Sequence, residues 1–230
     1  GEIISADSRQ VYRYMNIGTG KDISEYSQNN KLIPYHLIDI IDPREEYNLF
    51  SFIKDFNYSF QSILSKEKLP ILCGGTAMYV HAVLKGYEMK TADLSGNFAN
   101  ELNTLDTSAL EQMVRELKPG LHNKTDLTDR NRMISAIIIA SGKGESITPD
   151  KTVRPFIIGT FLPRDEVKRN IALRLEKRLK EGMIEEVKTL LEMGVSSERL
   201  KQLGLEYRFV MLFLFGEISY DEMHYKLRSA

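Results

Sequence analysis

The sequence predicts an α/β protein in which helices cover a mostly parallel sheet. Four short apolar runs, rich in β-branched residues and bounded by Pro, Gly or charged residues, have the pattern of buried strands. Helical patterns alternate with these runs, and this alternation is typical of parallel sheets with helices on their faces. Polar residues follow two of the runs directly, at the edge where open α/β sheets bind their ligands.

The predicted strands cover residues 2–5, 35–41, 69–73 and 155–161. Between residues 49 and 66, aromatic and aliphatic residues recur every fourth position, which indicates one buried helix face. The other predicted helices span residues 77–85, 105–117, 126–141, 164–181, 183–193, 203–215 and 220–228. Residues 87–153 show no strand pattern, so we expect a helical insertion there, with residues 1–86 and 154–230 forming the α/β core.

Composition narrows the class of protein. The length of 230 residues suits one domain with an insertion, and the formal net charge of -1 gives no overall basic excess, so any RNA contact needs a local patch. The single cysteine, Cys73, excludes an internal disulfide framework and is typical of the cytoplasm. The four histidines are far apart in sequence and predict no zinc site, and no apolar run is long enough to span a bilayer.

The two ends of the chain predict further sequence beyond them. The chain starts without Met at the edge of a strand pattern and stops inside a helical pattern. It holds no complete Gly-x-x-x-x-Gly-Lys-Ser/Thr loop, because Asp22 follows Gly20-Lys21 and Gly144 follows the second Gly-Lys pair. We therefore expect residues 1–230 alone to be inactive.

The residues after the first predicted strand suit both proton transfer and phosphate binding. Asp7 can accept a proton, and Gln10 can recognise an amide-like or purine-like edge. Thr19 and Lys21, which flank Gly20, can hold a phosphate. Asp7 could equally end the strand through local side-chain to backbone bonds, and the residues alone leave both interpretations open.

A second group follows the third predicted strand. Gly74 and Gly75 allow a ligand to approach the backbone, and Thr76 adds a hydroxyl at the start of a helix, where free N–H groups favour an anion. Thr76 could instead act as an ordinary helix cap. With Asp7 also at the carboxyl end of a strand, the two groups are expected at the same sheet edge.

Arginines supply two further candidates. Arg174 borders the apolar stripe of its predicted helix, with Arg178 one turn later, and could direct its guanidinium into a cleft to bind phosphate. Arg130 and Arg132 begin a helix of the insertion and suit contacts to an RNA backbone or base. Each pair could also belong to a solvated helix surface.

Nine motifs then occur in one order along nearly the whole chain. They resemble the tRNA dimethylallyltransferases, also called tRNA isopentenyltransferases. The motifs are Ile4-Ser5-Ala6-Asp7-Ser8-Arg9-Gln10-Val11-Tyr12, Met15-Asn16-Ile17-Gly18-Thr19-Gly20-Lys21, His36-Leu37-Ile38-Asp39 with Asp42-Pro43, Gly74-Gly75-Thr76-Ala77-Met78-Tyr79, Leu121-His122-Asn123 with Asp129-Arg130-Asn131-Arg132, Pro163-Arg164 through Arg174, Gly182-Met183-Ile184-Glu185-Glu186-Val187, Gly204-Leu205-Glu206-Tyr207-Arg208, and Gly216-Glu217-Ile218-Ser219-Tyr220-Asp221-Glu222-Met223.

The resemblance implies a fold, a reaction and partners. The fold is a P-loop kinase-like, nucleotide-binding α/β core with a helical insertion that grips the tRNA anticodon stem-loop. The reaction moves a dimethylallyl group from dimethylallyl diphosphate to N6 of the adenine 3′-adjacent to the anticodon, with Mg²⁺. The resemblance gives no metal ligands, and we expect a cytoplasmic monomer without a membrane partner.

The resemblance also implies roles for individual residues. Asp7 would bind the exocyclic amine and take its proton, and Thr76 would assist at the reacting centre. Arg174 and Lys21, with Thr19, would bind the diphosphate. Contacts to tRNA would come from Asp7, Ser8, Arg9, Gln10, Asn131, Arg132, Met133, Ile134 and Ser135.

Three departures from the family pattern leave other functions open. Ser135 and Ile138 stand where Arg and Glu are usual, and Asn170 stands where Arg is common. The alternatives are a transferase that uses free AMP, a small-molecule P-loop kinase, and a non-catalytic RNA-binding relative. The size of the predicted insertion favours a bulky RNA partner over the first two.

Overall fold

A three-stranded parallel sheet forms the centre of the computed structural model, which describes residues 1–117, 127, 129–143 and 145–229. The strands are β1 (Glu2–Ser5), β4 (Tyr35–His36) and β5 (Pro70–Cys73), in the order β4-β1-β5. Ile3 lies opposite Tyr35 on one side and Ile71 on the other. The predicted α/β class with a central parallel sheet is confirmed.

Two helices pack against this sheet because each presents one apolar face. Helix α1 (Leu49–Leu64) begins at Asn48, whose side chain accepts a hydrogen bond from the Ser51 N–H at 3.0 Å. Helix α2 (Ala77–Lys85) follows β5, and its Tyr79 ring stacks on Phe52 of α1 with 4.1 Å between the centroids. Both helices share a buried cluster with Ile4 of β1. The sequence predicts both helices to within two residues.

Strand β4 is much shorter than predicted. Leu37 and Asp39 have positive φ angles of 64° and 58°, which end the extended conformation after His36. The chain then turns toward the segment after β1, where the Asp39 and Ile40 N–H groups donate to the carbonyls of Gln10 and Val11. The apolar run at residues 35–41 thus packs against a loop in its second half.

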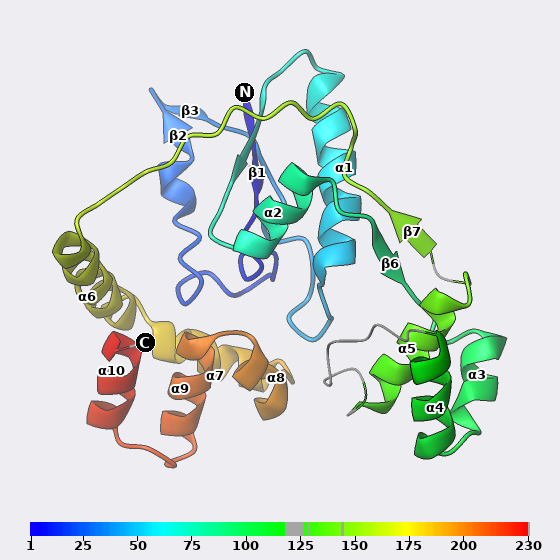
Figure 1. Cartoon of the computed structure of the whole chain (residues 1–230). Helices are drawn as coiled ribbons and strands as arrows, with labels where there is room; N and C mark the ends of the chain where they lie inside the picture. The colour runs from blue at the N-terminus through cyan, green and yellow to red at the C-terminus, as the bar shows by residue number, and fades with distance from the viewer. Residues whose placement is uncertain (118–126, 128, 144, 230) are drawn as a thin grey trace.

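The predicted strand at residues 155–161 is wrong. This segment has no regular secondary structure, and Phe156 and Phe161 are 90% and 88% exposed. It runs extended across the sheet end of the molecule from β7 to α6 (Figure 1). Its β-branched pattern meets no partner among the described strands, since β5 ends the sheet.

An insertion leaves the core through two antiparallel strands that the sequence analysis missed. Strand β6 (Met89–Thr91) pairs with β7 (Glu145–Ile147). Between them lie α3 (Asn97–Asn103), also missed, α4 (Thr107–Leu117) and α5 (Arg130–Ala140), which share their own buried cluster. The Leu121-His122-Asn123 motif and the predicted helix start at residue 126 lie outside the described residues.

The C-terminal third is helical, as predicted, with one additional short helix, α8. The helices are α6 (Arg164–Lys180), α7 (Met183–Glu192), α8 (Ser197–Gln202), α9 (Leu205–Leu214) and α10 (Tyr220–Ser229). Their buried cluster includes Val11, Tyr12 and Met15 from the segment after β1, so this helical group is fastened to the predicted site loop. Between Lys21 and β4, the chain forms the short 3₁₀-helix η1 (Ile23–Glu25) and the antiparallel pair β2 (Ser27–Gln28) and β3 (Lys31–Leu32).

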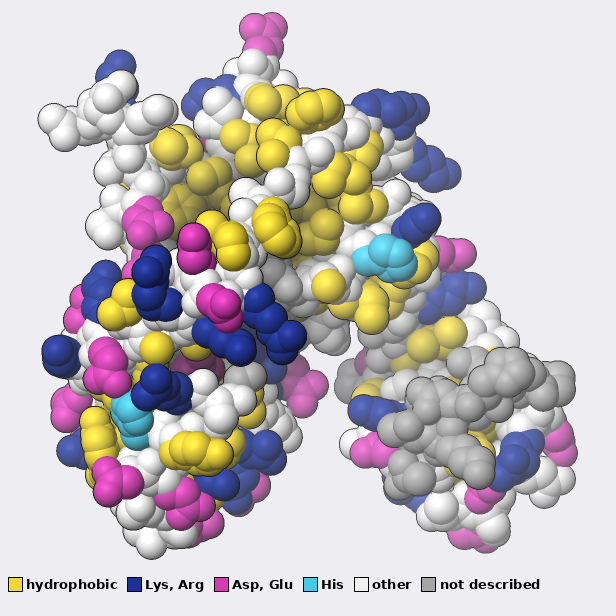
Figure 2. Space-filling model, turned by 60° about the vertical axis from the view of Figure 1, so that its left-hand side comes forward, with side chains coloured by type: hydrophobic (Ala, Val, Ile, Leu, Met, Phe, Trp, Pro, Cys, Tyr) yellow, Lys and Arg dark blue, Asp and Glu magenta, His cyan; other side chains and the backbone are white. Residues whose placement is uncertain are grey.

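The sheet with α1 and α2 lies above two helical groups (Figure 1). In the space-filling view, α6–α10 and the insertion form separate lower lobes with a gap between them (Figure 2). Within the described part of the chain, no helix combines the length and the apolar character needed to cross a membrane.

Candidate active site

Asp7 lies just beyond the carboxyl end of β1, in a turn that its own carboxylate stabilises. Its Oδ1 accepts hydrogen bonds from the Arg9 N–H at 2.8 Å and the Gln10 N–H at 3.3 Å. Among the described residues Oδ2 has no partner, and the side chain is only half-buried. The local bonds expected of a strand-ending Asp therefore exist, and they still leave one carboxylate oxygen available to a ligand.

Thr76 is joined to this turn through Ser8. The Thr76 hydroxyl oxygen accepts from the Ser8 N–H at 2.9 Å, and the hydroxyl donates to Ser8 Oγ at 3.2 Å. The same hydroxyl makes no capping bond to α2, so the interpretation of Thr76 as a side-chain helix cap is wrong. Asp7 and Thr76, which are 69 positions apart in sequence, thus belong to adjacent turns at one sheet edge.

The two glycines before Thr76 have different surroundings. A Cβ on Gly74 would lie 2.4 Å from the carbonyl carbon of Ala6, because the turn after β5 crosses the end of β1. A Cβ on Gly75 would have no atom within 4 Å. Gly74 is therefore required for the approach of the two turns, whereas Gly75 faces open space beside Thr76, where a ligand can approach the backbone.

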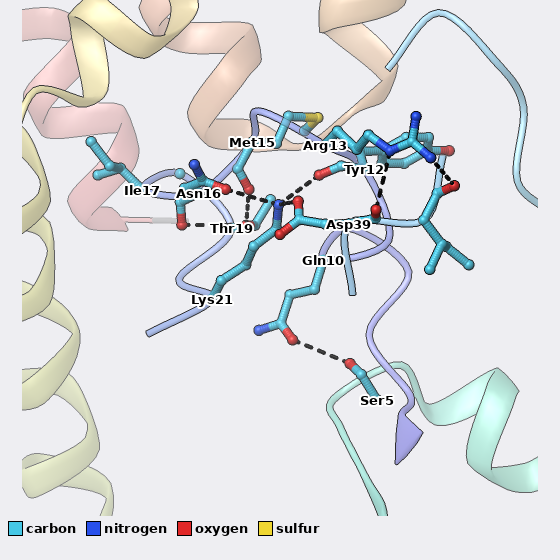
Figure 3. Close-up of polar contacts among 12 residues, drawn as sticks. Ser5, Gln10, Tyr12, Arg13, Met15, Asn16, Ile17, Thr19, Lys21 and Asp39 are labelled. Atoms are coloured by element: carbon cyan, nitrogen blue, oxygen red, sulfur yellow. Dashed lines mark hydrogen bonds and ion pairs between the residues drawn. The ribbon is translucent and has the colours of Figure 1, made fainter. Parts of the chain in front are cut away.

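Gln10 connects β1 to the glycine-rich loop at residues 15–21. Its Oε1 accepts from the Ser5 hydroxyl at 3.1 Å (Figure 3), and its Nε2 donates to the Gly20 carbonyl at 3.1 Å. These bonds fix the side-chain amide in the described conformation. Gln10 thus links strand β1 to the loop through its side-chain amide, a structural role that the sequence analysis did not predict.

Lys21 is buried, with 2% of its surface exposed, and points into its own loop (Figure 3). Its ammonium donates to the Tyr12 carbonyl at 2.6 Å, to Asn16 Oδ1 at 3.0 Å and to the Asp39 carboxylate. Burial lowers the pKa of Lys21, and the ion pair with Asp39 opposes that shift. Three acceptors satisfy all three N–H groups, so in this conformation Lys21 has none left for the predicted diphosphate.

Thr19 is likewise engaged within the loop. Its hydroxyl donates to the Met15 carbonyl, one turn earlier (Figure 3). Thr19 and Lys21 were predicted as phosphate ligands from their spacing around Gly20, and in the structure both side chains hold the loop closed on itself. Backbone carbonyl groups of the folded loop need hydrogen-bond donors, and the spacing of residues in the sequence does not reveal that Thr19 and Lys21 supply them.

The two candidate arginines of α6 have different environments. Arg174 is exposed and has no hydrogen bond or ion pair among the described residues, so the structure does not join it to Asp7 and Thr76. Arg178, one turn later, reaches the loop: it donates to the Gly18 carbonyl at 3.4 Å and lies 3.8 Å from Glu206. A Cβ on Gly20 would be 1.9 Å from its Nη2.

Sequence reasoning missed the residue with the most contacts to this loop, Glu186. Its carboxylate accepts from three consecutive backbone N–H groups, those of Asn16 and Ile17 at 2.7 Å and Gly18 at 3.0 Å. The Tyr207 hydroxyl donates to the same carboxylate at 2.7 Å, and burial raises the pKa of Tyr207 well above its usual value. Both residues lie in motifs quoted above for the resemblance, but no role was attached to either.

The predicted RNA-contacting residues of α5 divide by burial. Asn131 and Arg132 are exposed near the start of the helix, where the Asp129 side chain accepts from the Arg132 N–H. Met133 and Ile134 are 1% and 0% exposed in the core of the insertion, so in this structure their side chains are not available for the predicted tRNA contact. Ser135 donates its hydroxyl to the Asn131 carbonyl at 2.8 Å.

Arg130 and Arg9 complete the predicted polar set. Arg130 donates to the carbonyls of Asn103 and Leu105, which joins α5 to the end of α3 and gives it a structural role. Arg9 and Ser8 are half-buried in the turn that holds Asp7. Among the described residues no group of three or more His, Cys, Asp or Glu side chains is arranged to hold a metal ion.

Comparison with known proteins identifies the family of this chain. The model of the IPP transferase family matches residues 10–230. The chain is 47% identical to tRNA dimethylallyltransferase 1 of Azobacteroides pseudotrichonymphae and 44% identical to tRNA dimethylallyltransferase 2 of Trichlorobacter lovleyi, covering all of this chain and 76% and 75% of those proteins. The crystal structure of the tRNA isopentenylpyrophosphate transferase of Bacillus halodurans superposes with a TM-score of 0.66 at 28% identity, covering 100% of this chain and 74% of that one. The chain therefore belongs to the IPP transferase family, the tRNA dimethylallyltransferases.

Proposed function

We propose that the site beside Asp7 transfers a dimethylallyl group from dimethylallyl diphosphate to N6 of the adenine 3′-adjacent to the anticodon of a tRNA. Family membership makes this chain part of a prenyl-transferring enzyme. The observation that supports the site assignment is the Asp7 carboxylate, which two backbone N–H groups orient while Oδ2 stays without a partner. A held carboxylate with one available oxygen is suited to receive a proton.

The need for a proton acceptor follows from the low nucleophilicity of adenine N6. An exocyclic amine is a weak nucleophile, so its attack on the allylic carbon is helped by a base that removes a proton as the new bond forms. The N6–carbon bond forms, the carbon–oxygen bond to diphosphate breaks, and the N6 proton passes to Asp7. Because the adenine must leave the stack of neighbouring nucleotides to reach the allylic carbon, an unpaired loop nucleotide is the accessible substrate.

Groups around Asp7 suit the other side of the reaction. The Thr76 hydroxyl and the open backbone face of Gly75 lie at the N-terminal end of α2, where N–H groups and the helix dipole favour negative charge. We assign this corner to the reacting end of the donor. Arg174 is exposed on α6 without a partner among the described residues, and we propose that it binds the diphosphate oxygens.

A divalent cation, taken here as Mg²⁺, is also part of the proposal. The described residues hold no cluster that would bind such an ion by themselves. Mg²⁺ is commonly held by one or two carboxylates together with substrate phosphates. We therefore propose that the ion arrives with the diphosphate, whose oxygens supply most of its ligands.

The anticodon stem-loop is the proposed RNA partner. Asn131 and Arg132 present exposed polar side chains on the insertion, and Lys and Arg side chains gather on the lobe of α6–α10 across the gap (Figure 2). Local basic groups of this kind bind a phosphate backbone although the whole chain is close to neutral.

We propose that the enzyme acts in the cytoplasm as a monomer. Size-exclusion chromatography with light scattering tests the oligomeric state.

The decisive assay compares two acceptors in the complete gene product that carries this chain. Labelled dimethylallyl diphosphate is supplied with an anticodon stem-loop or with AMP, and the modified nucleoside is identified by mass spectrometry. Transfer to N6 of the stem-loop adenine, together with filter binding of that RNA, is expected. Turnover of AMP without stem-loop binding would instead establish the free-nucleotide transferase.

The RNA contact is tested separately through Arg132. We expect Arg132→Ala to weaken stem-loop binding and to lower the slope of log affinity against log salt by about 1, as for one lost phosphate contact. The matched control is Arg115→Ala, which removes an exposed arginine of α4 that is ion-paired with Glu111. An Arg132→Ala slope equal to that of the control contradicts the assigned contact.

A further inference from the structure

The carboxylate of Glu186 lies in an anion-binding turn of the loop at residues 15–21. Successive backbone N–H groups that converge in this way form a concavity for an anion, and here the anion is a side chain from α7. The Tyr207 hydroxyl is a fourth donor, so the Glu186 carboxylate accepts four hydrogen bonds in all. Hydrogen bonds to a charged group are stronger than neutral ones, so this contact defines the shape of the loop.

Tyr207 packs against the same loop by shape as well as by hydrogen bonding. Its side chain is 1% exposed, and a Cβ placed on Gly18 would lie 2.7 Å from the ring. Only glycine allows this approach of ring and backbone. The loop is therefore fitted closely to α7 and α9.

The same loop is linked to the Asp7 turn through Gln10. The Gly20 carbonyl, two residues after Gly18, accepts from Gln10 Nε2 at 3.1 Å. The Gln10 backbone N–H then donates to Asp7 Oδ1. Glu186 thus connects to the proposed base through Gly18, Gly20 and Gln10, although it touches neither Asp7 nor the open space beside Thr76.

We propose that Glu186, supported by Tyr207, is a positioning residue for the reaction: it holds the loop so that Gln10 and the Asp7 carboxylate keep the orientation that transfer requires. This inference rests on the proposed function. Errors in placing reacting groups lower rates steeply, and a displacement of 1 Å costs up to about 100-fold.

The test uses Glu186→Gln in the complete gene product. The variant keeps the size of the side chain but places an NH₂ group opposite backbone N–H donors, so part of the turn loses its acceptor. The matched control is Glu185→Gln, which changes an exposed carboxylate of the same helix turn. Values of kcat and KM for the stem-loop, and thermal unfolding, are measured for the unaltered protein and both variants.

We expect Glu186→Gln to lower kcat by roughly 10- to 100-fold at a temperature where the variant is fully folded, with a much smaller change in KM. Tyr207→Phe, which keeps the ring against Gly18 and removes one hydrogen bond, is expected to show a smaller loss. Because Glu186 acts through Gln10, the kcat losses of Glu186→Gln and Gln10→Ala should fail to add in the double variant. Additive losses, or a kcat equal to that of Glu185→Gln, overturn the inference.

A second measurement is independent of turnover. Hydrogen exchange followed by mass spectrometry should show faster exchange in Glu186→Gln at residues 16–18 and also at the Asp7–Gln10 turn, with neither change in Glu185→Gln. Faster exchange confined to residues 16–18 would mean that Glu186 supports its own loop only, and would refute the positioning role. If the unaltered protein fails to modify the stem-loop, the proposed function is refuted, and this exchange pattern still decides the inference.

If Glu186→Gln does not fold, Tyr207→Phe provides both measurements. Its phenyl ring preserves the packing that Gly18 requires, so only the hydrogen bond to Glu186 is lost. Normal kcat together with unchanged exchange at the Asp7–Gln10 turn in Tyr207→Phe would then overturn the supporting role of Tyr207 and the linkage with it.

Discussion

The two ends of strand β1 carry carboxylates with opposite surroundings. At the amino end, Glu2 is 2% exposed and is bound by three side chains: His36 at 2.7 Å, Lys68 at 2.8 Å and Lys66 at 3.4 Å. At the carboxyl end, Asp7 is half-buried, accepts two backbone N–H groups and has no ion pair among the described residues. Both residues are acidic, and both are fixed in place.

The contrast separates a carboxylate whose oxygens are all paired from the one that we propose as the base. Each carboxylate oxygen of Glu2 is paired with a lysine, Lys68 on one and Lys66 on the other, so a ligand would have to displace an ion pair to reach it. Asp7 is oriented through one oxygen only, and the other has no hydrogen-bond partner among the described residues. Saturation by partners, rather than acidity or position in the strand, therefore distinguishes the two sites, and three variants test this distinction.

The largest expected effect comes from Asp7→Asn. The asparagine oxygen can still accept from the Arg9 and Gln10 N–H groups, so the turn should persist while the proton acceptor is lost. We expect kcat for stem-loop prenylation to fall by roughly 100- to 10,000-fold, the range of a general base, with nearly unchanged thermal stability. Equal turnover by the variant and the unaltered protein would remove Asp7 from the mechanism.

The next effect concerns how the carboxyl end is built. Gly74→Ala would place its Cβ 2.4 Å from Ala6 backbone, and we expect it to lower the free energy of unfolding by about 1–3 kcal/mol, measured by urea denaturation. Gly75→Ala is the matched control, because its Cβ meets no protein atom. It should leave stability unchanged and raise KM for the donor. If the two alanine variants are equally stable, the approach of the two turns does not require Gly74.

The smallest effect is a pH dependence at the amino end. Hydrogen bonds from Lys68 and His36, aided by Lys66, lower the pKa of Glu2 from 4.5 to about 2. Because protonation is harder in the folded protein, the cluster stabilises the fold above pH 4.5, and this contribution is lost as pH falls toward about 2.

Unfolding temperatures measured across that acid range test this prediction. Glu2→Gln should be less stable than the unaltered protein near neutral pH, and the difference should shrink as pH falls through the range. Glu185→Gln, which removes an exposed carboxylate of α7, is the control. A difference that stays constant from neutral to acid pH contradicts the ionic origin of the Glu2 contribution.

Local patterns predicted those parts of the fold that local forces determine. The helices with one apolar face and the strands at residues 2–5 and 69–73 follow directly from periodicity. The pattern failed at residues 155–161, where the same apolar run meets no strand to pair with. It also missed β6 and β7, because strands of three residues show too little alternation to be recognised.

The site was predictable at the level of turns and less so at the level of side chains. The turns that carry Asp7 and Thr76 lie together, joined through Ser8, because the carboxyl ends of adjacent parallel strands share an edge, which the sequence analysis anticipated. Lys21 could not be placed from spacing, because its acceptors come from Tyr12 and Asp39 on different turns. Glu186 was missed for the same reason: its partners lie about 170 residues earlier in the chain.

The attachment of the insertion has one further consequence. The Asn57 side chain of α1 donates to the Thr148 carbonyl and accepts from the Asp150 N–H, both at 2.8 Å, which holds the chain just after β7 against the core. The helices between β6 and β7 are thus attached through a two-stranded stalk, which the side-chain amides of Asn57 and Gln61 bind from α1 and whose Met89 and Ile147 pack against the core. Because both amides belong to α1, this one core helix holds the base of the stalk, and the placement of α5 relative to the sheet depends on residues that lie outside the insertion.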